Sequence, residues 1–252
     1  MMRGDRRRKG ASLAAGVLGL LTLCAGAPAA AVTGTVLWYL EQEAGSEPYR
    51  VRYLVTAEFM RSDDGNDGND FVLLDRRERQ IYNVVPETAS VLIIDGKGPA
   101  PKKPARLAID VQESVDAQAP KLEGRQPLTL VLSADGDVCQ SAVVVPGLLD
   151  DARAAFREFA QVLAVQQART LGNTPAEFQT PCFLARDVYA GDFHLGAGVP
   201  LLEWAGQGTR RELLEFERNV PLAEGLFVVP DDLRVLKVQS GGSAAGDDWS
   251  DP

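Results

Sequence analysis

Few side chains in this sequence have the types and the spacing that catalysis requires. His194 is the only histidine, and it stands in a short segment bounded by Gly191 and Gly196. A histidine that acts as a general base needs a nucleophile within reach, yet the Gly-x-Ser-x-Gly pattern of serine hydrolases does not occur. We therefore expect His194 to be a loop residue without a chemical role, and we expect neither a catalytic residue nor a cofactor.

An acidic segment, Asp63–Asp70, carries carboxylates at a density that attracts Ca²⁺. Its register does not fit an EF-hand loop, because Gly65 stands at the third position and Leu74 stands where the loop requires glutamate. Asn, Asp and Gly between two expected strands are typical of a hairpin turn. We expect a turn here, with a weak cation site as the alternative. A lone histidine also provides too few ligands for a zinc site, so no metal is expected.

Acidic residues are numerous enough to permit a hydrolase that works with two carboxylates. Neighbouring pairs such as Asp150–Asp151 and Asp231–Asp232 arise from composition alone in a chain with 35 Asp and Glu residues. A glycosidase holds its two carboxylates at a fixed separation across a cleft, which a sequence does not reveal. An exported hydrolase that uses carboxylates is therefore an alternative function.

Residues 1–31 have the pattern of a secretory signal peptide. Five basic side chains near the start are followed by an uncharged apolar stretch and by three alanines that fit the cleavage pattern. We expect the mature protein to begin near Val32 and to be periplasmic or secreted, without stable insertion in a membrane. An uncleaved membrane anchor is one alternative. Lipid attachment is another, because the four residues that end at Cys24 resemble a bacterial lipoprotein box, apart from Leu23.

Cys139 and Cys182 are the two cysteines that remain once the signal peptide is removed. An even number of cysteines in an oxidising compartment favours a disulfide. This one would close a loop of roughly 43 residues and stabilise the fold by about 4 kcal/mol in the chain-entropy model. Two unpaired buried thiols are the alternative.

The charge balance narrows the choice of partners. The chain carries a net charge of −9, and removal of residues 1–31, with five basic side chains and one acidic one, makes it −13. An acidic surface repels phosphate backbones, so we expect no nucleic-acid partner. The same charge disfavours adsorption to anionic membranes.

Short alternating segments dominate the first half of the mature chain. Tyr49–Thr56 is the clearest, since Val51, Tyr53 and Val55 share one face. Turn residues separate each segment from the next with no helical pattern between them, which predicts an antiparallel meander. The other expected strands are Gly34–Glu43, Glu58–Arg61, Asp70–Asp75, Gln80–Val85, Ser90–Asp95, Ala105–Val111, Gln126–Ser133, Val138–Val145, Val199–Ala205, Arg210–Glu217 and Leu233–Val238.

One segment changes to a helical period. Apolar residues recur every three or four positions from Leu149 to Leu163, with two aspartates at the start, and this predicts a helix over 149–170 that covers the sheet. The expected fold class is α+β, a curved antiparallel half-barrel meander with one main covering helix inserted late. It forms a single domain over 32–240, followed by a disordered tail at 241–252 that is rich in Gly, Ser and Asp.

The strand pattern resembles the LolA/LolB-like superfamily of periplasmic lipoprotein carriers and their exported relatives. The resemblance rests on the meander EFMRSDDG…DFVLLDRRERQIYNV from Glu58 to Val84 and on PLAEGLFVVPDDLRV from Pro221 to Val235. It implies an open barrel whose apolar cavity holds acyl chains, with a lipid or lipoprotein as partner. The segment between the two cysteines does not match the carriers themselves.

An open barrel would line its cavity with aromatic side chains. The candidate cavity residues are Trp38, Tyr53, Phe71, Trp204 and Phe216, and the alternative is that they belong to a packed core. The leading hypothesis is an exported, non-enzymatic binding module of the bacterial envelope that holds an apolar ligand or a lipoprotein acyl chain. A structural or interaction protein of the envelope is a further alternative.

Overall fold

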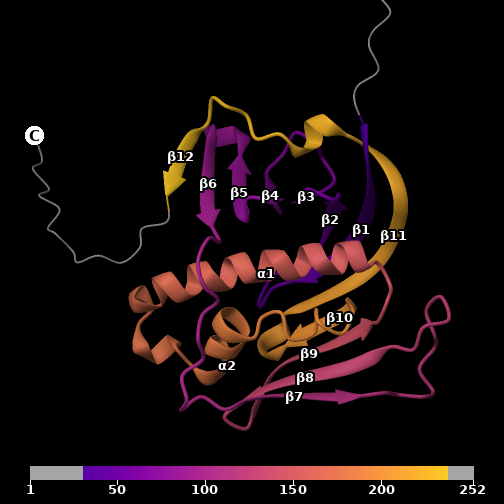
Figure 1. The fold of residues 1–252 in the computed structure, drawn as a ribbon, viewed down its shortest axis with the longest axis vertical. Helices are drawn as coiled ribbons and strands as arrows, with labels where there is room; N and C mark the ends of the chain where they lie inside the picture. The colour runs from indigo at the N-terminus through magenta and orange to yellow at the C-terminus, as the bar shows by residue number, and fades with distance from the viewer. Residues whose placement is uncertain (1–30, 238–252) are drawn as a thin grey trace, which may run out of the picture.

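Alternating apolar residues build twelve strands in the described part of the chain, and the strands hydrogen-bond into one sheet. The computed structural model describes residues 31–237 (Figure 1). Residues 1–30 of the expected signal peptide, the candidate lipid site at Cys24 and the expected tail at 241–252 lie outside these residues, whereas Ala31 begins β1. The strands are β1 (Ala31–Gln42), β2 (Tyr49–Val55), β3 (Phe59–Asp63), β4 (Phe71–Asp75), β5 (Gln80–Val85), β6 (Ser90–Asp95), β7 (Ile109–Ser114), β8 (Leu128–Ala134), β9 (Asp137–Val145), β10 (Val199–Ala205), β11 (Arg210–Ala223) and β12 (Arg234–Lys237).

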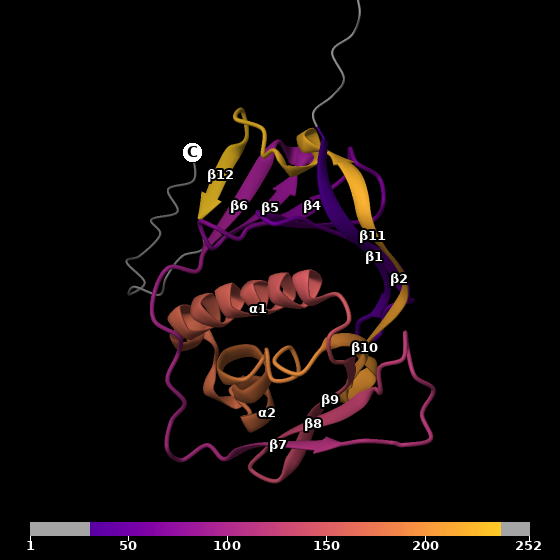
Figure 2. The ribbon, with the colours of Figure 1, turned by 45° about the vertical axis from the view of Figure 1, so that its right-hand side comes forward.

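The sheet holds twelve strands in the order β12-β6-β5-β4-β3-β2-β1-β11-β10-β9-β8-β7. Every neighbouring pair is antiparallel except β12 and β6, which run parallel. The sheet curls into a C around the helices, and the segment 96–108 crosses its open side between β6 and β7 (Figure 2). The predicted fold class, a curved sheet with one main covering helix, is confirmed.

The main helix, α1 (Asp150–Thr170), fills the concave side of the sheet. Its apolar face buries Ala152, Ala155, Phe156 and Val162. These side chains pack in one cluster with residues that point inward from the sheet, which include Leu37, Tyr39, Val55, Leu74 and Ile81. Burial of each large apolar side chain stabilises the fold by about 1.5–3 kcal/mol, so this cluster holds the helix in place. Among the residues described, no helix is long and apolar enough to cross a membrane.

Two segments differ from the sequence-based expectation. The strand β11 continues to Ala223, beyond the expected end at Glu217, because β1 pairs with it along its whole length, from Gln42 opposite Arg210 to Ala31 opposite Ala223. The stretch around Cys182, for which no helix or strand is expected above, forms the single turn α2 (Pro181–Phe183) and then a π-helix (Leu184–Tyr189). In both segments tertiary packing outweighs the local sequence pattern.

The predicted disulfide between Cys139 and Cys182 is confirmed, with a Cα–Cα distance of 5.0 Å. Cys139 belongs to β9 and Cys182 belongs to α2. The bond therefore fastens α2 and the π-helix behind it to the sheet.

The acidic segment after β3 forms the predicted turn, and a buried carboxylate holds it. Asp63 accepts hydrogen bonds from Arg52 at 2.8 and 2.9 Å, from Arg61 at 2.7 Å and from the amide of Gly65 at 2.9 Å. Arg61 also donates to the carbonyl of Leu226 at 2.8 Å. One carboxylate thus connects β2, β3 and the segment that leads to β12. We call Arg52, Arg61 and Asp63 the outer ion cluster.

Substitution of Asp63 by Asn tests the outer ion cluster. Burial alone would raise the pKa of Asp63, but the hydrogen bonds from Arg52, Arg61 and Gly65 outweigh it, so the pKa lies below its ordinary value. A depressed carboxylate pKa contributes stability that is present above the ordinary value of about 3.9 and is lost as the pH falls through the folded-state value. We expect Asp63→Asn to lower the free energy of unfolding by about 3–5 kcal/mol at neutral pH, because it leaves the buried Arg61 without a carboxylate and leaves the half-buried Arg52 with only the exposed Asp67.

Urea denaturation between neutral and acidic pH measures this effect. The unfolding free energies of the wild type and Asp63→Asn should converge as the pH falls. The exposed neighbour Asp64 provides the matched control, since Asp64→Asn leaves both buried ion pairs intact. A pH-independent difference, or an equal loss in Asp64→Asn, would contradict the assignment.

Candidate functional site

A row of alternating charge crosses three strands on the concave face. The strand register places Glu41 opposite Arg211, and Arg211 opposite Glu203, so their side chains share one face. Arg211 Nε lies 3.1 Å from Glu41 Oε1, and Arg211 Nη1 lies 3.1 Å from Glu203 Oε2. We call these three residues the charge ladder. It brings together groups that are far apart in the sequence.

Aromatic rings enclose the cation at the centre of the ladder. The Arg211 guanidinium lies 4.1 Å from the ring centre of Tyr39, 4.6 Å from that of Phe156 and 4.9 Å from that of Tyr53. Its Nε and Nη2 atoms are buried and form no hydrogen bond, although Nε lies within ion-pair distance of Glu41. The negative faces of the rings partly compensate for the missing hydrogen bonds. Since Phe156 belongs to α1, the cage also joins the helix to the strands.

His194 extends the ladder on the side of β10. Its Nε2 atom lies 3.0 Å from Glu203 Oε1, and its side chain is only 4% exposed. The other ring nitrogen, Nδ1, is buried and has no hydrogen-bond partner. His194 lies in the expected turn before β10, but its burial against a carboxylate was not predicted. Gln140 donates to the same Oε1 atom at 3.3 Å.

The surroundings keep the ladder ionised. Burial alone would raise the pKa of Glu203, but the neighbouring His194 and Arg211 lower it to about 2. Burial would likewise lower the pKa of Arg211, and the adjacent Tyr53, Glu203, Tyr39 and Glu41 outweigh that effect and raise it. Each charge therefore depends on the others to remain inside the fold.

The π-helix faces the ladder from the other wall of the concave side. Such helices are rare and occur frequently at functional sites. Arg186 and Asp187 lie on it, with 3.9 Å between a guanidinium nitrogen and a carboxylate oxygen. Burial raises the pKa of Asp187, and Arg186 offsets part of that rise. The disulfide that precedes this helix fixes the position of both side chains relative to the sheet.

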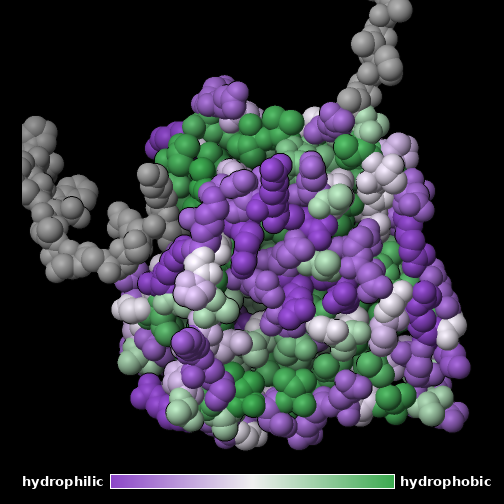
Figure 3. All heavy atoms as spheres, viewed as in Figure 1, coloured by the Kyte–Doolittle hydropathy of each residue, from purple (hydrophilic) through white to green (hydrophobic). Residues whose placement is uncertain are grey.

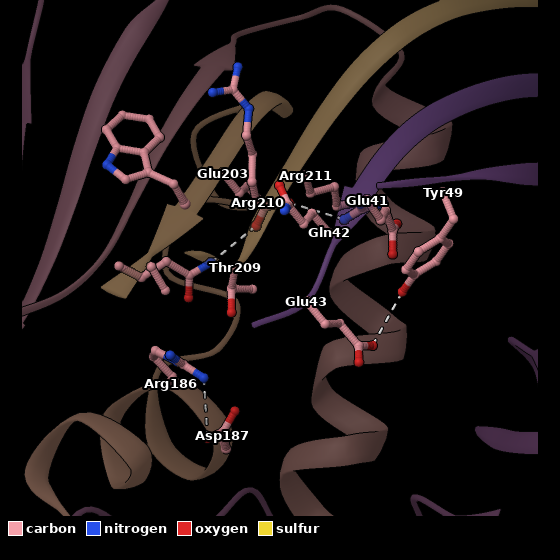
Figure 4. Close-up of a pocket in the computed structure, with 13 residues that line it drawn as sticks. Glu41, Gln42, Glu43, Tyr49, Arg186, Asp187, Glu203, Thr209, Arg210 and Arg211 are labelled. Carbon is pink, nitrogen blue, oxygen red and sulfur yellow. Dashed lines mark hydrogen bonds and ion pairs between the residues drawn. The ribbon is translucent and has the colours of Figure 1, made fainter. Parts of the chain in front are cut away.

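Two clefts flank the ladder and share part of their walls. The rim cleft, of about 300 Å³, opens at the ends of β1, β10 and β11, and most of the residues in its wall are charged or polar (Figure 4). The inner cleft, of about 260 Å³, lies beneath α1 and includes Met60, Phe159 and Leu163 in its wall. Residues common to both walls are Arg186, Asp187, Glu203 and Arg211. A polar mouth and a largely apolar interior therefore meet at the ladder.

The structure does not bring the five candidate cavity aromatics into one cavity. Tyr53 belongs to the cage around Arg211, and Phe216 packs at the edge of the same core. Phe71 lies in a second cluster, on the face of the sheet away from α1. Trp38 also points away from α1, and Trp204 is 39% exposed. The five residues thus occupy several separate environments.

Strand alternation explains the position of Trp38. Its neighbours Leu37 and Tyr39 point into the concave core, so Trp38 points outward. There the Arg50 guanidinium lies 4.6 Å from its ring. A Cβ atom on Gly65 would come within 2.5 Å of the same ring, so the ring needs a glycine at this turn.

The ladder itself was missed by the sequence analysis, although a signal for it exists. Glu41 continues the inward row that Leu37 and Tyr39 begin, and Glu203 and Arg211 continue apolar inward rows in the same way. A charged residue at an inward position is a sign of a buried ion pair. In the described part of the chain no three His, Cys, Asp or Glu residues are grouped in a way that could hold a metal ion.

Comparison with known proteins assigns no family to this chain. No protein family and no curated protein sequence matches it. Two solved structures of PNGF-II, in the C2 and P21 space groups, resemble it with a TM-score of 0.38 and sequence identities of 6% and 7%. The matches cover 83% and 82% of this chain but 31% and 32% of the PNGF-II chains. The chain thus spans about a third of their length, and a likeness at this level carries no conclusion about function.

Truncation of Arg211 tests the ladder. We expect Arg211→Ala to lower the free energy of unfolding by about 3–5 kcal/mol, because the half-buried Glu41 would lose its cation and the buried Glu203 would keep only His194 beside it. The adjacent Arg210 pairs with Glu212 at the surface, 53% and 42% exposed, so Arg210→Ala should cost less than about 1 kcal/mol. Chemical denaturation of both variants measures the difference. Equal losses would show that the ladder does not hold the strands.

Proposed function

We propose that this protein is an exported binding module that holds an amphiphilic ligand, such as a lipid or a lipoprotein acyl chain, beneath α1. The observation that carries the proposal is the meeting of the rim and inner clefts at Arg186, Asp187, Glu203 and Arg211. A ligand with an apolar chain and a polar head would place the head in the rim cleft and the chain in the inner cleft. The curved sheet around one helix is also the layout that a LolA/LolB-like carrier would have.

The inner cleft provides the surface for the chain. Phe159 and Leu163 approach from α1, and Met60 approaches from β3. Each methylene group that leaves water for such a surface gains about 0.8 kcal/mol. A cleft of 260 Å³ is small for a ligand site, since sites for small molecules are typically about 300–1,000 Å³. The rim cleft must therefore hold part of the ligand.

The rim cleft provides polar partners for the head. Among the described residues, Asp187 is the only ion-pair partner of Arg186, at 3.9 Å, and this is longer than a hydrogen bond. The Arg186 guanidinium thus has donors available for a carbonyl or phosphate oxygen. Arg211 already serves two carboxylates and is the less available cation.

The disulfide of this fold supports export to an oxidising compartment. The bond between Cys139 and Cys182 is a structural disulfide. Such bonds persist in oxidising compartments, which include the periplasm and the extracellular space. The signal-like sequence at residues 1–31 supports the same location.

Filling the inner cleft should weaken ligand binding. Ala164 lies in the cleft wall on α1, whereas Ala154, on the same helix and also half-buried, does not. We expect Ala164→Phe to weaken binding of a fluorescent fatty acid at least about tenfold, and Ala154→Phe to leave it nearly unchanged. Calorimetry of the wild type should give a negative heat-capacity change, because apolar surface is buried. Absence of binding, or equal effects of the two variants, would contradict the proposal.

A hydrolase is the second candidate, and one observation favours it. Asp187 and Glu203 face the same clefts, and their pKa values are shifted in opposite directions, upward for Asp187 and to about 2 for Glu203. Carboxylates with separated pKa values are the usual arrangement of a general acid and a base or nucleophile.

If the protein is a hydrolase, Asp187→Asn should lower turnover about 10²–10⁴-fold, since it removes a general acid. Nitrophenyl glycosides and nitrophenyl esters provide the assay, and the exposed Asp232 provides the matched variant, Asp232→Asn. Hydrolysis no faster than in buffer, across both substrate sets, would eliminate this candidate and leave the binding module unaffected.

A further inference from the structure

A larger groove lies away from the charge ladder. It has a volume of about 690 Å³, against 300 and 260 Å³ for the rim and inner clefts. Its walls come from the start of β1, the turn between β2 and β3, and the 3₁₀ turn Glu224–Phe227 with the residue after it. None of its lining residues belongs to either cleft, so it is a separate feature. We call it the apolar groove.

The lining of the groove is mainly apolar and partly exposed. The rings of Phe59 and Phe227 stack with their centres 5.8 Å apart and their planes at 18°. Val228 beside them is 59% exposed, which is high for a large apolar side chain next to two aromatic rings. Val32 and Ala57 complete the apolar wall. Figure 3 shows that apolar residues also gather along the upper end of the sheet, whereas polar residues cover α1.

Two unpaired carboxylates stand at this groove. Glu58 and Glu224 are both exposed and belong to its lining, and no lysine or arginine does. Within residues 31–237 neither carboxylate forms an ion pair, whereas carboxylates elsewhere on the sheet, such as Glu215 and Glu41, pair with arginines. The groove therefore combines a large apolar surface with uncompensated negative charge.

We propose that the apolar groove binds a segment of a partner protein that carries large apolar side chains flanked by lysine or arginine. Apolar side chains would pack against Phe59, Phe227 and Val228, and the flanking cations would pair with Glu58 and Glu224. The negative charge disfavours an acyl chain with an anionic head, because the head would meet two carboxylates of the same sign. This inference does not depend on the proposed ligand beneath α1.

Three matched peptides test the inference on the full mature chain. Dye-labelled Lys-Leu-Phe-Leu-Lys contains both features, Glu-Leu-Phe-Leu-Glu reverses the charge, and Lys-Ser-Ser-Ser-Lys removes the apolar side chains. Fluorescence polarisation should show that the first binds at least about tenfold more tightly than either of the others, because recognition needs both the apolar contact and the opposite charge. Its affinity should fall as salt is added, since exposed ion pairs are screened.

Variants of the groove provide the second arm of the test. The double variant Glu58→Lys with Glu224→Lys should reverse the preference between the lysine and glutamate peptides. Val228→Asp should weaken binding of the first peptide about tenfold, whereas Val138→Asp, at a valine that is 66% exposed outside the groove, should not. Thermal melting of each variant checks that it is folded.

Equal binding of the lysine and glutamate peptides would overturn the proposal. So would binding that the charge-reversed double variant leaves unchanged. If an uncharged dodecyl glycoside below its micellar concentration bound the groove, with sensitivity to Val228→Asp but not to charge reversal, the groove would be a lipid site and the proposed partner segment would be wrong. Because Ala164 lies in the wall of the inner cleft and not in that of the apolar groove, the two binding proposals can fail independently.

Discussion

The buried charge of Arg211 is the constraint on which the sheet most depends. An isolated guanidinium cannot remain inside a fold, so it must find both carboxylates and the aromatic cage at once. Glu41 comes from β1, Glu203 from β10 and Phe156 from α1. A slip of one residue in β11 would turn Arg211 to the outer face, and both carboxylates would lose the Arg211 guanidinium. The same contact therefore fixes the register of three strands and the position of the helix across them.

A second polar network acts on the opposite face of the sheet, on the neighbouring strands β2 and β3. The outer ion cluster ties β2 and β3 to the segment after β11 through the bond from Arg61 to the carbonyl of Leu226. This segment also carries Phe227, which forms part of the apolar groove. Apolar clusters on both faces of the sheet make up the rest of the core. The candidate ligand sites lie beside these networks, where side chains are held firmly but the surface is not filled.

Local patterns predicted the elements of this fold well, because strand alternation and the helical period of α1 depend only on residues that are close in the sequence. The disulfide could also be predicted, since only two cysteines lie outside the expected signal peptide. The candidate site was not, because Glu41, Glu203 and Arg211 meet only through a register that includes irregular steps between β1 and β11. The position of Trp38 depends in the same way on its surroundings: alternation next to Tyr39 sets its face, whereas its aromatic character alone suggested a cavity. The π-helix depends on packing behind the disulfide and left no local signal.

The position of β11 in the sheet determines when the sheet can be completed during synthesis. This strand lies between β1 and β10, so it joins the first six strands of the chain to β7–β10. A chain that emerges with its N-terminus first exposes the long open edge of β1 until Arg210–Ala223 has followed. Such an edge is a template for wrong pairing, and closure between distant segments is slow. The edge of β1 therefore stays without its partner strand until almost the whole domain has been synthesised.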